Sequence, residues 1–162
     1  MQLIKSMSDS IKIVNLKTLT TTDKLTFKKS FVGCLVLTSN NKILLQQRGG
    51  DWDRYPDCLA TFGGKIEFQE NPEQALVREL NEELGANVAL DDVISLGAIT
   101  ESDTNHSELI YAYFWHDKHN SITGCYEGKP AYYNNYSEAL THPKILDDVI
   151  WIINECLARK LI

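Results

Sequence analysis

The stretch over residues 63–86, GGKIEFQENPEQALVRELNEELGA, limits more than any other how this chain can fold. Two adjacent glycines follow the apolar, strand-like run over residues 59–62. Further along, Asn71 is a good helix N-cap, Pro72 suits the first helical position, and Gly85 is a natural helix stop. We therefore predict a strand, a glycine turn, and a helix that begins at Pro72 and ends just before Gly85.

The predicted helix has an apolar stripe and an acidic face. Three leucines at i, i+4 and i+8 anchor it on a core: Leu76, Leu80 and Leu84. Three glutamates share another face: Glu79, Glu82 and Glu83. They lie in the C-terminal half of the helix, where its macrodipole does not favour acids. Arg78 lies one turn before Glu82, and Glu70 precedes the helix, within reach of Arg78 if the chain folds back.

This acidic face fits either a metal site or a solvated surface. A hard divalent cation would remove the mutual repulsion, because Mg²⁺ prefers oxygen ligands and keeps waters for substrate phosphates. Gly63 and Gly64 lack side chains, so their backbone can approach a metal closely and offer a carbonyl as a further ligand. However, glutamate-rich helices are common on protein surfaces, so the charge pattern alone leaves both interpretations open.

The spacing of these residues resembles the Nudix box. The matching positions are Gly64, five residues, Glu70, seven residues, Arg78-Glu79-Leu80, one residue, Glu82-Glu83, one residue, and Gly85. The closing position usually carries a bulky aliphatic side chain and here is Ala86, and the residue before the glycine pair is often proline and here is Phe62. The resemblance covers the chain from about Phe31 to its last residue.

This resemblance implies an α+β Nudix fold, in which a curved mixed β-sheet is sandwiched between helices as α/β/α layers. We expect a single Nudix domain over residues 25–162, preceded by an N-terminal segment over residues 1–24 that contains a short edge strand. Family members use Mg²⁺ or Mn²⁺ to hydrolyse a pyrophosphate bond in a nucleoside diphosphate linked to another moiety. The expected substrate is thus a small nucleotide: a nucleotide-sugar, a dinucleotide, or an (oxidised) nucleoside triphosphate.

A second hypothesis is a Nudix-fold module that binds a nucleotide without cleaving it. Such modules usually lose carboxylates of the box, whereas this chain has kept all of them. The resemblance therefore favours an enzyme, a nucleotide pyrophosphohydrolase acting on phosphorus-containing acid anhydrides.

The resemblance also implies roles for the box residues. Metal would be held by the carboxylates of Glu79, Glu82 and Glu83, together with the Gly63 carbonyl. Either Glu79 or Glu82 would orient or deprotonate the attacking water. Arg78 would position Glu79 and pair with Glu70.

Many family members add a carboxylate from a loop well after the box. Our candidate is Glu127, which follows a strand region and precedes a glycine. Three other acids compete for this role: Glu101, Asp103 and Glu108.

Four residues near the box are candidates for substrate binding, each with a structural alternative. Arg48 can contact a phosphate bidentately or be an exposed strand-end arginine. Trp52 and Tyr55 can stack on a nucleobase or pack within their own loop. Phe62 can line the pocket or belong to the core.

The remaining pattern predicts a strand-rich chain that closes with a helix. Expected strands are Ile11–Leu16, the second half of Leu25–Leu37, Lys42–Arg48, Ile66–Phe68, Val88–Ala98 and Leu109–His116. A turn is expected over 18–22, a helical turn from Ser137, and a terminal helix from Pro143. The loop over 49–57 and the regions over 100–107 and 128–136, to which the sequence assigns no shape, would determine substrate specificity.

Composition limits the partners and the compartment. A net charge of −6 argues against non-specific binding to nucleic acid or to anionic membranes. No apolar run approaches the roughly 20 residues that span a bilayer, and the start, MQLIKSMSDS, lacks an apolar signal-peptide core. The four cysteines show no C-x-x-C spacing, as expected for reduced thiols in a cytoplasmic protein. The oligomeric state stays open, with a homodimer among the alternatives.

Overall fold

The structure, a computed structural model, describes residues 10–162. The first nine residues of the predicted N-terminal segment lie outside this described part. Within residues 10–162, no helix combines the length and the apolar character needed to cross a bilayer.

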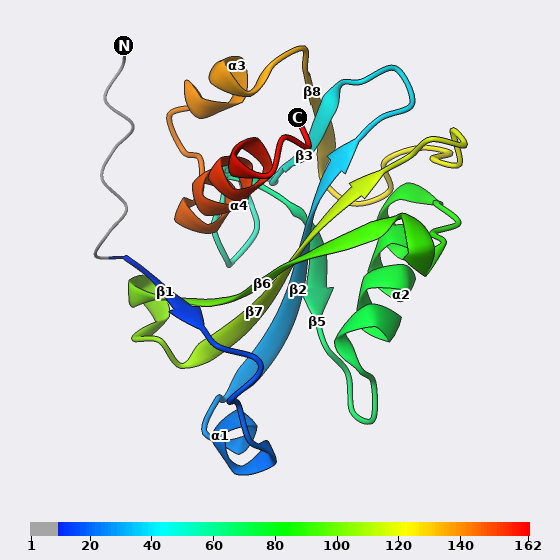
Figure 1. The fold of residues 1–162 in the computed structure, drawn as a ribbon. Helices are drawn as coiled ribbons and strands as arrows, with labels where there is room; N and C mark the ends of the chain where they lie inside the picture. Colours follow the sequence, from blue (N-terminus) through cyan, green and yellow to red (C-terminus); the bar gives the residue numbers. More distant parts are fainter. Residues whose placement is uncertain (1–9) are drawn as a thin grey trace.

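Eight strands form one mixed sheet (Figure 1). The strands are β1 (Ile11–Val14), β2 (Lys29–Leu37), β3 (Ile43–Gln47), β4 (Leu59–Ala60), β5 (Phe62–Lys65), β6 (Val93–Glu101), β7 (Glu108–His116) and β8 (Lys129–Tyr133). Their order is β1-β6-β7-β2-β3-β4, with β5 paired to β2 and β8 paired to β3. The central pair, β2 and β7, is parallel, and the other pairs are antiparallel.

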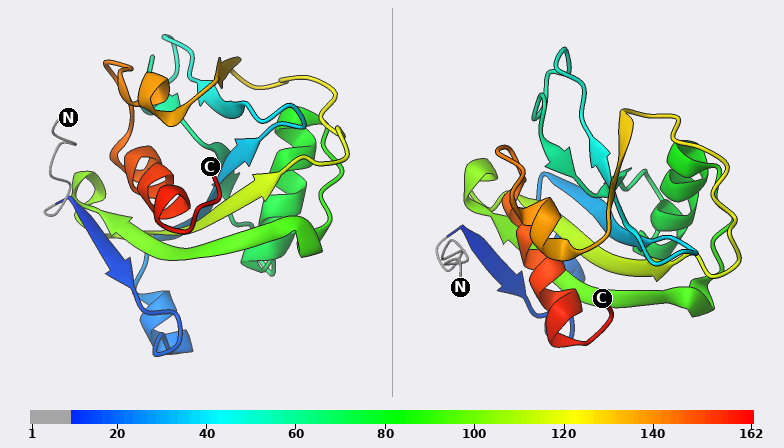
Figure 2. Two further views of the ribbon diagram at one scale, coloured as in Figure 1. Left: turned by 45° about the horizontal axis from the view of Figure 1, so that its top comes forward. Right: turned by 90° about the horizontal axis from the view of Figure 1, so that it is seen from above.

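Two long helices cover opposite faces of this sheet, as the views in Figures 1 and 2 agree. Helix α2 (Pro72–Leu84) packs one core cluster against β2, β5 and β7, and α4 (Asp147–Ala158) packs the other against β2, β3 and β7. The helices α1 (Thr21–Leu25) and α3 (Tyr136–Leu140) are short, and two 3₁₀ turns span Leu90–Asp92 and Ser102–Thr104. These helix–sheet–helix layers are the arrangement that the resemblance noted above implies.

The box helix has the predicted bounds, because local signals set both of its ends. Asn71 caps its start by accepting from the Gln74 backbone N–H at 2.8 Å. Gly85 ends it with a left-handed φ of 61°, where a Cβ would stand 3.2 Å from the Cβ of Thr123. The three stripe leucines, Leu76, Leu80 and Leu84, are fully buried. Full burial of such side chains stabilises the packed helix by about 1.5–3 kcal/mol each.

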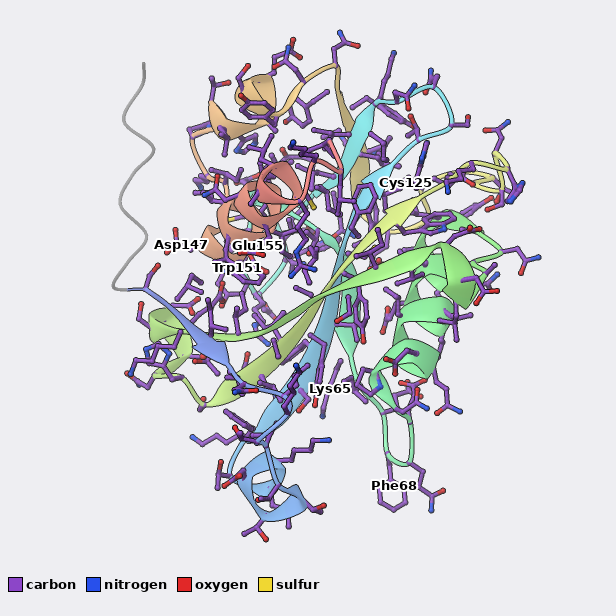
Figure 3. All side chains as sticks on the ribbon, in the orientation of Figure 1. Lys65, Phe68, Cys125, Asp147, Trp151 and Glu155 are labelled. Atoms are coloured by element: carbon purple, nitrogen blue, oxygen red, sulfur yellow. The ribbon has the colours of Figure 1, made fainter. Side chains whose placement is uncertain are left out.

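Several predicted elements differ from the structure. The strand expected over 66–68 is wrong, because the chain turns there, with Gln69 at φ 64° and Phe68 exposed at the tip, pointing away from the body (Figure 3). The strand expected from Val88 begins only at Val93. The turn expected over 18–22 overlaps the start of α1. A capping box between Thr20 and Asp23 stabilises the first turn of this helix.

Two further differences concern the C-terminal third of the chain. The terminal helix does not begin at Pro143, because Lys144 and Leu146 first form backbone hydrogen bonds with Leu59, at 3.0 and 3.2 Å. The region over 128–136, to which the sequence assigns no shape, contains strand β8, which pairs with β3. Both cases depend on pairing with residues distant in sequence.

Candidate active site

Arg78 is the centre of an ion-pair network on α2 that joins four carboxylates or carbonyls. Its Nε and Nη2 donate to the two oxygens of Glu70, at 2.7 and 2.8 Å. Its Nη1 donates to Glu79 Oε1 at 2.8 Å and lies 3.4 Å from Glu82 Oε2. Its Nη2 also donates to the Lys65 carbonyl at 3.0 Å. The planar guanidinium thus fixes the loop before the helix, while holding Glu79 in place.

The two glycines of β5 bring the helix carboxylates against the sheet. The Gly63 N–H donates to Glu83 Oε2 at 2.9 Å. At Gly64, a Cβ would stand 2.6 Å from the carboxyl carbon of Glu79, closer than real contacts allow. Gly63 itself has φ 148° and faces the Val32 backbone. Glycine is therefore required here, because any side chain would occupy the space of a carboxylate or a backbone group.

Burial raises the cost of charge on this face. It raises the pKa of Glu83 to about 9, a shift that the Gly63 N–H opposes and that nearby Glu127 increases. Burial also raises the pKa of Glu79, although Arg78 acts in the opposite direction. By contrast, the Arg78 guanidinium lowers the pKa of Glu70 to about 2. Glu82 is largely exposed and is free to turn toward a ligand.

A substitution at Gly64 tests this packing directly. We expect Gly64→Ala to lower kcat/KM about 100-fold, because the new methyl displaces the Glu79 carboxylate, and small misplacements can cost that much. Overpacking would also destabilise the fold by about 1–3 kcal/mol. Steady-state kinetics and thermal unfolding measure the two effects. The control is Gly124→Ala, where a Cβ meets only the Tyr126 ring, at 3.1 Å or more, and full activity of both variants would contradict this role.

A pocket of about 260 Å³ opens beside the glycines, and residues from several segments that are distant in sequence line it. The candidate late carboxylate, Glu127, lines it together with Gly63 and Gly64, and it lies close enough to Glu83 to perturb the pKa of that residue. The competitors Glu101 and Glu108 line the same pocket. Asp103 accepts a hydrogen bond from the Tyr55 hydroxyl.

The four substrate-binding candidates have different surroundings. Arg48 lines the pocket, but its Nε and Nη2 donate to carbonyls of the 49–57 loop. Trp52 stacks 4.4 Å from the Arg48 guanidinium and lines a neighbouring hollow instead. Tyr55 lines the pocket itself. Phe62 is fully buried in the core under α2, which is the second of the two alternatives given for it.

Sequence reasoning missed two charged residues that line the pocket. Arg54 comes from the 49–57 loop, pairs with Glu108 and lies over the Phe31 ring. Asp148 comes from the first turn of α4. The two consecutive acids in the first turn of α4 are visible in the sequence. However, acids are common at helix starts, because the helix macrodipole stabilises negative charge there, so they do not by themselves indicate a pocket.

The residues present fit a divalent cation. No group of three or more His, Cys, Asp or Glu side chains is already gathered for a metal within residues 10–162. The reason is visible in the contacts, since Glu79 is held by Arg78 and Glu83 by the Gly63 N–H. Even so, two buried carboxylates lie against side-chain-free backbone, with Glu82 and Glu127 nearby. Such an oxygen-rich set suits Mg²⁺ or Mn²⁺.

Known proteins resemble this chain in both sequence and fold. The NUDIX domain family model matches residues 28–142. The CTP pyrophosphohydrolase of Escherichia coli is 29% identical over 116 residues, covering 70% of this chain and 82% of that protein. An 8-oxo-dGTP diphosphatase of Escherichia coli is 45% identical over 51 residues, covering 32% of this chain and 39% of that protein.

Solved structures agree with these matches. The solution structure of the Escherichia coli ORF135 protein has a TM-score of 0.62 and 25% identity, covering 85% of this chain and 94% of that one. The MutT protein from Methanosarcina mazei Go1 has a TM-score of 0.66 at 15% identity, covering 82% and 94%, and so shows the fold alone. With a family model over most of its length and the same α+β fold, the chain belongs to the Nudix family and is a Nudix-type hydrolase.

Proposed function

We propose that this protein hydrolyses a pyrophosphate bond of a small nucleotide with the help of Mg²⁺ or Mn²⁺. The observation that carries the proposal is the set of carboxylates held against Gly63 and Gly64, at the mouth of a pocket that Glu127 also lines. Two relatives are named for nucleoside triphosphate substrates, CTP and 8-oxo-dGTP, so a nucleoside triphosphate is the favoured class.

Four carboxylates and one carbonyl would hold metal: Glu79, Glu82, Glu83, Glu127 and the Gly63 carbonyl. A bound divalent cation neutralises charge on the phosphates and lowers the pKa of a water molecule. Arg78 keeps Glu79 in place through the 2.8 Å contact and leaves its second oxygen free. Glu82, exposed and weakly held at 3.4 Å, is free to orient or deprotonate the water.

The cationic side of the pocket would hold the phosphates. Arg48 and Arg54 are the two arginines that line it, and both are anchored by other contacts. Anchoring reduces the entropy that an arginine loses on binding a phosphate. Tyr55, in the same loop, adds an aromatic wall.

Incubation with nucleoside triphosphates, nucleotide-sugars and dinucleotides, followed by product identification, tests the proposal. We expect turnover with Mg²⁺ or Mn²⁺ and none after chelation with EDTA. Metal at about ten times its Kd should also stabilise the fold by about 1.4 kcal/mol, which raises Tm by about 4 °C for a chain of this size. Glu83→Gln is the control that should lose this rise. Tight nucleotide binding without products would contradict hydrolysis and favour a binding module.

A further inference from the structure

A loop over residues 123–128 carries the candidate late carboxylate and is docked on the end of the box helix. The last carbonyls of a helix have no partner within the helix and require donors from outside it. Here the Tyr126 N–H donates to the Glu83 carbonyl at 2.8 Å, and the Thr123 N–H donates to the Leu84 carbonyl at 2.9 Å. Figure 1 shows this loop beside the C-terminal end of α2. The loop thus completes the helix that carries the other carboxylates.

These backbone contacts end one residue before Glu127. The Glu127 side chain is exposed, although it lines the pocket together with the two glycines of β5. An exposed side chain keeps much of its rotamer freedom, so its carboxylate reaches the pocket reproducibly only if its backbone is fixed. The next residue, Gly128, has a left-handed φ of 67° and leads the chain into β8. The direction of the peptide group between these two residues therefore determines where the carboxylate points.

Gln46 on β3 holds this peptide group. Its Nε2 donates to the Glu127 carbonyl at 3.1 Å. Gly128 lies directly over the same side chain, because a Cβ there would stand 3.0 Å from Gln46 Cγ. The thiol of Cys125, labelled in Figure 3, donates to the same Glu127 carbonyl at 3.3 Å. Two donors from different segments thus fix one carbonyl oxygen, and a side chain at position 128 would push the turn away from β3.

The position of Gln46 would suit an apolar residue. Its side chain is 2% exposed, and strand alternation places it on the same face as Leu44, which belongs to the core under α2. A buried amide requires hydrogen-bond partners, whereas an apolar side chain of similar size requires none. Burial alone therefore does not account for a glutamine here, whereas the contact with the Glu127 carbonyl does.

We infer that Gln46 is a positioning residue for Glu127. It acts through the loop backbone, because its amide fixes the Glu127 carbonyl and so directs the carboxylate into the pocket near Glu83. This inference rests on the proposed function, in which Glu127 helps to hold a divalent cation. Residues that orient a metal ligand typically change metal affinity 10- to 100-fold when they are replaced, on the order of what we expect here.

Metal titration of the metal-free protein tests this role without any turnover. The Kd for Mn²⁺, measured by EPR, should be about 10-fold weaker in Gln46→Met, whose side chain has a similar length but cannot donate. Gln47→Met is the matched control, because Gln47 follows on the same strand and donates to the carbonyl of a different loop residue, Asp57, at 2.9 Å. This control should leave the Kd unchanged. An unchanged Kd in Gln46→Met would overturn the inference.

A double-mutant cycle separates positioning from a general loss of structure. If Gln46 acts through Glu127, then Gln46→Met should weaken Mn²⁺ binding no further in a Glu127→Gln background. Equal weakening in both backgrounds would overturn the inference. Gly128→Ala disrupts the same contact from an exposed loop position and should show the same dependence on Glu127, so the cycle can be completed if Gln46→Met does not fold.

Backbone order in the metal-free protein separates this inference from the proposed function. We expect the NMR order parameter of the Gly128 amide to fall from about 0.85 toward about 0.6 in Gln46→Met, and to stay high in Gln47→Met. A Gly128 amide that stays rigid in both variants would overturn the positioning role, whatever the metal affinity. Conversely, a loosened Gly128 in a protein that binds no Mn²⁺ and cleaves no nucleotide would uphold the anchoring of Glu127 by Gln46 and reject the proposed function.

Discussion

Glu83→Gln and Glu82→Gln are each expected to lower kcat/KM about 1,000-fold at saturating Mg²⁺. Each change replaces a carboxylate of the proposed metal site by a neutral amide of the same shape. The loss of about 4 kcal/mol of transition-state charge stabilisation corresponds to three powers of ten in rate. Steady-state kinetics with the best substrate of the panel measure the effect.

Stability measurements distinguish this loss from misfolding. The Gly63 N–H can still donate to a glutamine at position 83, and the neutral side chain avoids a buried charge. The Tm of metal-free Glu83→Gln should therefore match or exceed that of the wild type. Glu73→Gln is the matched control, because Glu73 is exposed on the same helix and contacts Tyr113 instead of the network. Activity within threefold of wild type in the Glu82 and Glu83 variants would reject both roles.

Arg78→Lys is expected to reduce kcat about 100-fold and to lower Tm. Lysine keeps the charge, but it cannot span the two oxygens of Glu70, the Lys65 carbonyl and Glu79 at once. Glu79 would then leave its place beside Gly64, and a displacement of about 1 Å can cost 100-fold in rate. Kinetics and thermal unfolding at fixed metal concentration give both numbers.

The control for this prediction is Arg159→Lys at the end of α4. Arg159 also donates to two carbonyls, of Ser95 and Leu96, and lies 3.4 Å from Glu155. Its replacement should lower Tm without changing kcat. If Arg78→Lys behaves in the same way, Arg78 is only a structural residue.

The box could be predicted from sequence because its signals are local. Asn71, Pro72 and Gly85 set the helix ends through neighbours within a few residues. The pairing of Glu70 with Arg78 was also predictable, since eight residues and a helix start bring them together. The roles of these residues in catalysis remain predictions.

The rest of the site could not be predicted, because it depends on contacts between distant segments. Asp148 reaches the pocket only because residues before α4 pair with Leu59 on β4. Likewise, β8 was missed because Pro130 weakens its strand signal, although proline suits a strand paired on one side only. Phe62 stayed open between pocket and core because a strand residue beside a glycine pair can face either side of the sheet, and here it faces the α2 core.

The parallel pairing of β2 with β7 has a consequence for how the molecule acquires its shape. These strands are far apart in the chain. The box and the 49–57 loop lie between them, and Glu127 lies beyond β7. Closing such a long loop costs entropy before any contact compensates for it, so parallel pairings form late and slowly. A growing chain would therefore carry a complete box helix well before it has a pocket, and hydrolytic competence would appear only when the central strands have joined.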